Sequence, residues 1–161
     1  MKDILKCRLI KGVVTKPRIE FESPVEASVS FEVEKIGKEL KSVIVKKFGR
    51  SLNIRELDSG SCGACESEII STTNPIYDVQ RFGINFVASP RHADALLVTG
   101  PVSRNMLIAL KKTFEGMPEP KFVIALGDCA VSGGIFNESY YTIGRVDSIL
   151  PVLLHIPGCP P

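Results

Sequence analysis

The chain has 161 residues, of which 44% are hydrophobic and 24% are charged. That composition suits a single domain with one core and excludes collagen-like, mucin-like and wholly disordered proteins. No apolar run approaches the roughly 18 residues that span a bilayer. The amino terminus lacks the apolar stretch and small-residue cleavage site of a secretory signal. We therefore expect the chain to stay on the cytoplasmic side.

Charge is unevenly distributed along the chain. Its 20 Lys and Arg exceed its 18 Asp and Glu by only two, so the net charge of +2 gives no reason to expect a nucleic-acid partner. Residues 1–50 hold 12 basic against 7 acidic residues, whereas residues 51–161 hold 8 against 11. The basic segment could face anionic lipid or an acidic partner, or it could be an ordinary solvated surface. We expect an amino-terminal extension over residues 1–50 and one α/β domain over residues 51–161.

The extension contains one predicted helix. Pro17 and Pro24 predict irregular or extended chain over its first part. Over residues 34–48 apolar side chains recur at helical spacing with lysines between them, and Gly49 follows as a helix-ending residue. This pattern predicts an amphipathic helix, whose apolar face could pack on the chain's own core, on another subunit or on a membrane surface.

From residue 51 onward, short apolar runs alternate with segments of helical periodicity. Predicted strands cover residues 51–57, 84–88, 95–99, 121–126 and 152–156, and predicted helices cover residues 65–72 and 102–114. Strands separated by helices predict a parallel sheet with right-handed crossovers. Ligands of such sheets bind beyond the carboxyl ends of the strands. The loops directly after the strands are therefore the candidate functional segments.

Three of these loops carry cysteine. Cys62 and Cys65 follow the first strand as C-x-x-C, Cys129 follows the fourth strand, and Cys159 follows the last. Glycines at positions 60, 63, 127 and 158 would let the backbone approach a bulky cofactor and point N–H groups at its sulfurs. The fifth cysteine, Cys7, lies in the irregular segment, and we expect it to be incidental.

The cysteine pattern leaves several chemistries open. Five cysteines are too few for a disulfide scaffold. Four thiolates suit either tetrahedral zinc or an iron–sulfur cluster. Structural zinc usually draws its ligands as two close pairs, whereas only one pair is close here, which favours a cluster. A redox-active C-x-x-C with two incidental thiols is a third reading, although that motif needs no further loop cysteines.

The motifs taken together resemble a known family. They are SCGACE at residues 61–66, RFG at 81–83, SPRHAD at 89–94, VTGP at 98–101, GDCA at 127–130 with GG at 133–134, and IPGCPP at 156–161. Over residues 51–161 they are similar to the small electron-transfer subunit shared by respiratory complex I and the [NiFe] hydrogenases. Complex I members usually have adjacent first cysteines, so the C-x-x-C spacing resembles more closely the membrane-bound group 4 hydrogenases, including formate hydrogenlyase. Family members normally continue into a final helix, whereas this sequence ends at Pro161.

The resemblance implies a flavodoxin-like parallel sheet with helices on both faces. It also implies one [4Fe–4S] cluster at the carboxyl ends of the strands, held by Cys62, Cys65, Cys129 and Cys159. The protein would then be a relay subunit, without a catalytic centre of its own, in a membrane-bound oxidoreductase. Its implied partners are a large catalytic subunit, a ferredoxin-like two-cluster subunit and membrane-arm subunits. A stand-alone iron–sulfur carrier and a zinc-stabilised structural module are the alternative functions.

Several charged residues near the motifs are further candidates. Glu66 and Glu68 could interact with the positive end of their helix or pass protons at an interface. Candidates for hydrogen bonds near a cluster or for ion pairs across an interface are Arg81, Arg91 and His92. Asp128 lies beside a cysteine, and the sequence assigns it no role. The chain has no second C-x-x-C pair for nickel and no G-x-G-x-x-G for a nucleotide cofactor.

Overall fold

The computed structural model describes residues 24–161, with side chains from Phe31 onward. The chain divides into two units between Glu39 and Leu40. The irregular chain expected over residues 2–22, and Cys7 within it, lie outside the described residues. Within the described residues, no helix is long and apolar enough to cross a bilayer.

Helix α2 spans Pro24–Phe48. Its predicted end is confirmed: Gly49 follows with φ +66°, and its N–H donates to the carbonyl of Val45 at 2.9 Å. The predicted start was wrong by ten residues, because Pro24 lies within the helix rather than interrupting the chain before it. Proline is favoured in the first turn of a helix, where its missing N–H costs no hydrogen bond.

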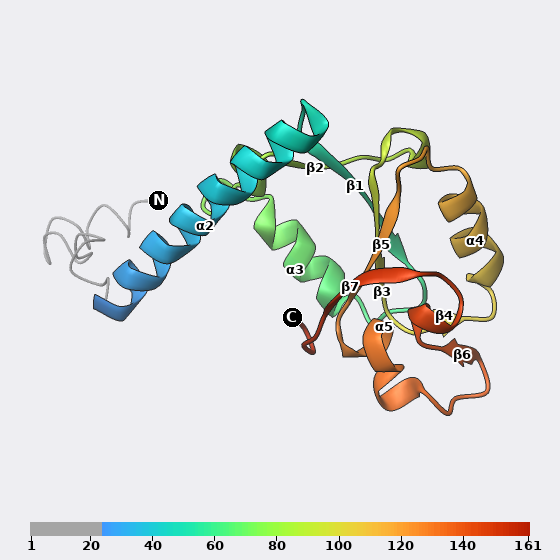
Figure 1. Ribbon diagram of the computed structural model, residues 1–161. Helices are drawn as coiled ribbons and strands as arrows, with labels where there is room; N and C mark the ends of the chain where they lie inside the picture. The colour runs from blue at the N-terminus through green and yellow to red at the C-terminus, as the bar shows by residue number, and fades with distance from the viewer. Residues whose placement is uncertain (1–23) are drawn as a thin grey trace, which may run out of the picture. The chain divides into compact units, whose positions relative to one another are not determined.

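The core of the second unit is a sheet of five parallel strands in the order β2-β1-β3-β5-β7 (Figure 1). The strands are β1 (Leu52–Asp58), β2 (Ile84–Phe86), β3 (Ala95–Thr99), β5 (Phe122–Leu126) and β7 (Val152–Ile156). All five predicted strands are confirmed, with ends that differ by no more than two residues. Counted along the chain, this is the 2-1-3-4-5 order of flavodoxin-like sheets, so the predicted fold is confirmed.

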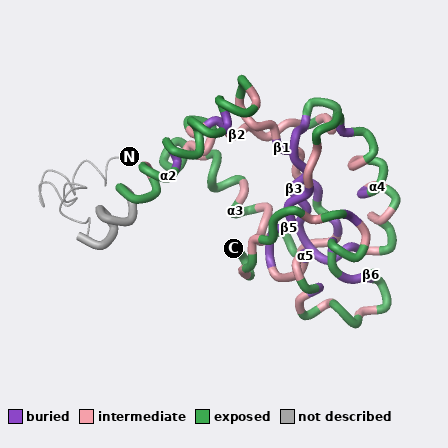
Figure 2. The backbone as a smooth tube through the Cα atoms, viewed as in Figure 1, coloured by how far each residue is buried: buried purple, intermediate pink, exposed green. Residues whose placement is uncertain are grey.

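Helices cover both faces of this sheet. Strand β3 is buried throughout (Figure 2). Its side chains alternate between two apolar cores. Leu96 and Val98 belong to the core that packs on α4 (Leu107–Glu115) and α5 (Asp128–Ser132). Ala95 and Leu97 belong to the core under α3 (Ala64–Thr72), which has no buried residue of its own. The apolar core on the α3 face of the sheet is therefore the smaller of the two.

The segment predicted as one helix over residues 102–114 is instead a strand followed by a helix. Strand β4 (Val102–Ser103) pairs antiparallel with β6 (Thr142–Gly144), and α4 begins only at Leu107. The backbone N–H of Ser103 donates to Ser59 and that of Arg104 to Tyr141, so these groups are bound outside any helix. Short elements that the sequence did not predict are η2 (Val79–Phe82), η3 (Pro90–His92), α5, η4 (Gly134–Phe136) and η5 (Val146–Ser148).

Candidate metal centre

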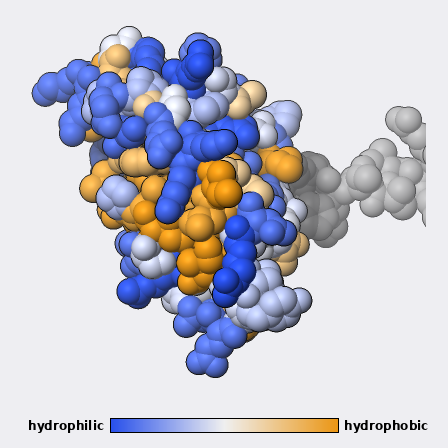
Figure 3. Space-filling view, turned by 90° about the vertical axis from the view of Figure 1, so that its right-hand side faces the viewer, coloured by the Kyte–Doolittle hydropathy of each residue, from blue (hydrophilic) through white to orange (hydrophobic). Residues whose placement is uncertain are grey.

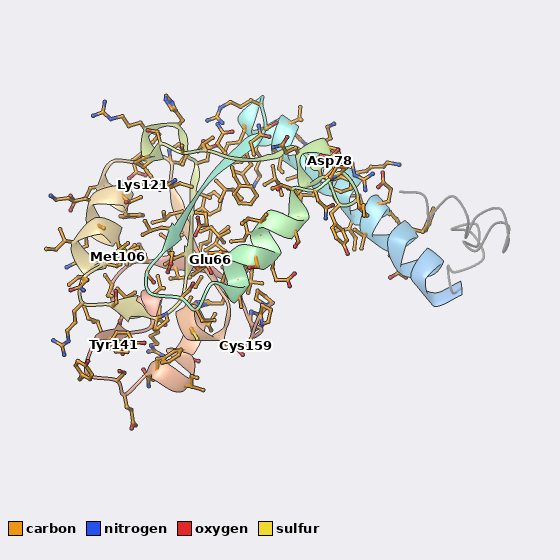
Figure 4. The ribbon with its side chains drawn as sticks, turned by 180° about the vertical axis from the view of Figure 1, so that it is seen from behind. Glu66, Asp78, Met106, Lys121, Tyr141 and Cys159 are labelled. Atoms are coloured by element: carbon orange, nitrogen blue, oxygen red, sulfur yellow. The ribbon has the colours of Figure 1, made fainter. Side chains whose placement is uncertain are left out.

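The four predicted cysteines line one small pocket beyond the carboxyl ends of β1, β5 and β7. Cys62 and Cys65 lie at the start of α3, Cys129 lies in the first turn of α5, and Cys159 follows β7. All four thiols are free. Figure 4 shows Cys159 close to the amino end of α3, where Glu66 is also labelled. The structure thus brings together the four residues chosen from the sequence, and their role as ligands stays a prediction.

The pocket disfavours thiolates unless a positive charge balances them. Burial, together with the charges of Glu66 and of the other three cysteines, raises the pKa of Cys65 to about 11. Burial likewise raises the pKa of Cys129, followed by the effects of Cys159 and Cys62. A bound metal would supply the missing positive charge, and its binding would release the thiol protons.

Two glycines leave room beside the sulfur atoms. A Cβ on Gly127 would lie 2.6 Å from Sγ of Cys65, and one on Gly134 would lie 2.8 Å from Sγ of Cys129. Both residues also have positive φ, +88° and +52°, which glycine adopts without steric cost. Backbone without side chains is what a bulky sulfur-ligated group needs around it. The donor set and these glycines therefore fit an iron–sulfur cluster.

The described side chains do not form a site for a single metal ion. Among the side chains that the structure describes, no three His, Cys, Asp or Glu groups are close enough to hold one ion.

The loop before Cys62 is held by its own side chains. Oδ1 of Asp58 accepts hydrogen bonds from the backbone N–H groups of Gly60 and Ser61, both at 2.7 Å. The hydroxyl of Ser61 in turn accepts one from the N–H of Gly63 at 3.0 Å. Buried Ser59 donates its hydroxyl proton to the carbonyl of Thr99 at 2.7 Å, which ties the loop to β3. The turn that presents Cys62 is thus fixed by polar contacts.

Two carboxylates approach each other on the α3 face of the sheet. Both carboxylate oxygens of Glu66 and one of Glu56 are shielded from solvent without a hydrogen-bond partner among the described residues. Burial raises the pKa of Glu56, and the charge of Glu66 raises it further. The sequence singled out Glu66 but missed Glu56, because an acid within a strand normally faces solvent. Glu68 is exposed and lines a separate pocket with Asn74 and Tyr77.

Three other predicted residues do not reach the cysteine pocket. Arg91 and His92 are exposed and precede β3, at the edge of the sheet opposite the cysteines. Arg81 precedes β2, with its guanidinium 4.5 Å from the ring centre of Phe82. None of the three side chains lines the pocket. Ion pairs across an interface stay a prediction.

Comparison with known proteins places the chain in a family. Residues 62–161 match the family model described as NADH ubiquinone oxidoreductase, 20 Kd subunit. That match covers all four cysteines of the pocket and more than half of the chain. The chain belongs to this family. The predicted resemblance to complex I and hydrogenase small subunits is thereby confirmed.

Similar proteins include subunits of a membrane-bound hydrogenase, of formate hydrogenlyase and of a membrane-bound sulfane sulfur reductase. The "Probable membrane-bound hydrogenase subunit mbhJ" of Pyrococcus furiosus is 48% identical over 118 residues, which cover 73% of this chain and 71% of that protein. Formate hydrogenlyase subunit 7 of Escherichia coli is 46% identical over 122 residues, which cover 76% of this chain. The matched residues are only 48% of the length of that relative. A chain of the archaeal membrane-bound sulfane sulfur reductase aligns with a TM-score of 0.61 and 37% identity, over 70% of this chain and 62% of that one.

Proposed function

We propose that the protein is the electron-relay subunit of a membrane-bound oxidoreductase of the hydrogenase and complex I type. One [4Fe–4S] cluster would be bound by Cys62, Cys65, Cys129 and Cys159. The observation that carries the proposal is the convergence of four free thiols on one pocket in a chain of this family.

The chain's own residues would prepare the site for that cofactor. A bound cluster supplies one-electron oxidation and reduction, at a potential set by its surroundings. The four thiols are the ligands, and Gly127 and Gly134 leave space beside them. The reaction with substrate is assigned to a partner, as the resemblance to relay subunits implies.

The proposed partners are a large catalytic subunit, a ferredoxin-like two-cluster subunit and membrane-arm subunits, with this chain on the cytoplasmic side of the membrane. Exposed apolar side chains near the pocket support permanent association. Ile135 and Tyr140, in the segment after α5, are 90% and 89% exposed. Figure 3 shows a further apolar patch on the side that carries α4 and β6, where Ile108 and Ile143 are exposed. Permanent interfaces are large and apolar, whereas a freely diffusing carrier would expose these side chains to water.

The proposal is tested by replacing each of the four cysteines with alanine in the full chain. Iron, acid-labile sulfide and the visible absorption that bleaches on reduction should fall in all four variants, because iron loses a thiolate ligand in each. Cys7→Ala is the matched control and should retain all three. A colourless protein containing zinc would instead favour the structural module. A monomer that keeps a full cluster in air and co-purifies with no partner would favour the stand-alone carrier.

A further inference from the structure

We propose that Asp128 is a positioning residue that joins the Cys129 and Cys159 loops into one ligand-bearing unit. This inference rests on the proposed function of the four cysteines. Cys62 and Cys65 share one turn of chain, so their spacing is set locally. Cys129 and Cys159 each follow one of two neighbouring strands, β5 and β7, whose pairing extends to Leu126 and Ile156. Beyond that point the relative position of the two cysteines depends on contacts between the segments that carry them.

Asp128 makes these contacts with both polar backbone groups of Gly158. Its carboxylate oxygen Oδ1 accepts a hydrogen bond from the N–H of Gly158 at 2.8 Å. Its own backbone N–H donates to the carbonyl of Gly158, also at 2.8 Å. A third bond runs from the N–H of Gly127 to the carbonyl of Ile156 at 2.7 Å. The residue before each cysteine is thus bound to the residue before the other.

Residue 158 is packed so closely that it has no room for a side chain. Gly158 has φ +135°, and a Cβ at this position would overlap Cα of Pro161. The backbone can approach the Asp128 side chain because no side chain of residue 158 intervenes. Asp58 acts in the same way on the other half of the site, where its Oδ1 binds two N–H groups of the Cys62 loop. An aspartate after a parallel strand therefore holds each half of the cysteine set.

The charge of Asp128 does not explain its place beside the pocket. Its carboxylate is one of the groups whose negative charge opposes ionisation of Cys129. The favourable contribution of Asp128 is therefore the hydrogen bond that Oδ1 accepts. An amide oxygen at the same position can accept that bond without the charge. Asparagine should accordingly replace aspartate in this role, whereas alanine should not.

The test compares Asp128→Ala and Asp128→Asn in the full chain, loaded with ferrous iron and sulfide. In Asp128→Ala we expect faster iron loss to a chelator and an iron affinity lower by about 10- to 100-fold, the loss of metal affinity that follows removal of groups that orient metal ligands. Exchange of the Gly158 amide hydrogen should also speed up, while exchange in β3 stays unchanged. Asp128→Asn should retain iron as the wild type does. Its midpoint potential should be higher, because a negative charge beside the more negative reduced state has gone.

The matched control is Asp147→Ala, which removes a carboxylate paired with Arg145 at 2.8 Å outside the pocket. It should leave iron retention unchanged. The inference is overturned if Asp128→Ala keeps iron as the wild type does, or if Asp128→Asn loses it as fast as Asp128→Ala. If Asp128→Ala does not fold, Asp128→Asn is compared with the wild type directly, and faster loss of its iron overturns the inference. If the cysteine variants keep their iron, the proposed function fails. If the cysteine variants lose their iron but Asp128→Ala keeps it, this inference alone fails.

Discussion

Arg50 and Asp94 form a two-pronged ion pair at the edge of the sheet opposite the cysteines. The guanidinium nitrogens lie 2.9 and 2.7 Å from the two carboxylate oxygens, and the backbone N–H of Asn53 donates to the same carboxylate at 2.9 Å. The side chain of Asp94 is only 9% exposed, while that of Arg50 is 51% exposed. The pair links the chain just before β1 to the residue before β3, and so supports the two strands whose far ends carry the site.

Arg50→Ala should lower the free energy of unfolding by about 1–2 kcal/mol, because a nearly buried carboxylate loses its charged partner. Half of the Arg50 side chain is exposed, so solvent screening keeps the loss at this modest size. Urea denaturation measures it. Arg145→Ala removes a more exposed pair and should cost less than about 1 kcal/mol. Equal losses in the two variants would contradict this account, and cluster content should change in neither.

Gly127→Ala tests whether the space beside Cys65 matters for the cluster. A Cβ there would displace the sulfur atom, which lies 2.6 Å from its position. Gly49→Ala is the control: Gly49 also has positive φ, +66°, but nothing lies within 4 Å of its added Cβ. Through the backbone alone, Gly49→Ala should cost about 1–2 kcal/mol of stability, and Gly127→Ala, at φ +88° and ψ 154° where side chains are rarely tolerated, about 1–3 kcal/mol. Only Gly127→Ala should lower the iron content, and similar iron losses in both would show that strain rather than space matters.

The sheet could be predicted from the sequence because its signals are local. Strands β3 and β5 are continuous apolar runs of the length that a buried parallel strand needs. The short strand β4 could not be found in this way. Its partner β6 lies forty residues further along the chain, and Val102 fits the helical periodicity that follows it. The early start of α2 was missed because proline is typical both of irregular chain and of the first turn of a helix.

The cysteine set could also be predicted, because the carboxyl ends of parallel strands meet at one edge. The groups that support it could not. Asp128 was conspicuous beside Cys129, but its partner Gly158 is a backbone group 30 residues away. The environment of Glu56 depends on the position of α3 over the sheet, which no pattern in β1 reveals. Side-chain identity thus indicated the ligands, while their support depends on tertiary contacts.

Glu56→Gln should change stability in a pH-dependent way. Burial raises the pKa of Glu56 above its usual value of 4.5, so the folded chain binds this proton more tightly than the unfolded chain does. Stability from this group is therefore fully present below pH 4.5 and is lost as pH rises through the raised pKa. Glutamine carries no charge to bury, so the variant should be more stable than the wild type at neutral pH. Denaturation curves across the pH range should show the two converge in acid, and a constant difference would contradict the assignment.

Tyr140→Ala should weaken attachment to the large subunit. Tyr140 projects from a segment that is held in place: Nε of Arg104 donates to its carbonyl at 2.7 Å, and its ring packs edge-on against Tyr141. The same segment contacts the cysteine pocket through Gly134. Rigid, exposed tyrosines are typical of residues whose truncation weakens binding about tenfold or more.

The measurement is co-purification of a tagged chain with the proposed large subunit, quantified against iron content. Tyr77→Ala is the matched control, because Tyr77 is 61% exposed but lies beyond the far end of α3. It should leave the complex intact, and iron content should be unchanged in both variants. A greater loss of the large subunit from Tyr77→Ala would place the interface on the other side of the domain.

Deletion of residues 1–33 should loosen attachment to the membrane complex without removing the cluster. The compact unit that holds the pocket begins at Leu40, and Ile44 is buried within it, so the deletion spares the α2 residues that belong to this unit. The part of α2 that stays exposes Ile36 and Val43. The removed segment holds six lysine and arginine residues against five acidic ones, and each lysine or arginine that lies near an anionic surface contributes about 1 kcal/mol, screened by salt. Membranes washed at increasing salt should therefore release the truncated chain earlier than the full chain, with equal iron in both. If truncation instead abolishes folding and cluster insertion, residues 1–33 are part of the domain's structural core, and a docking role for them is wrong.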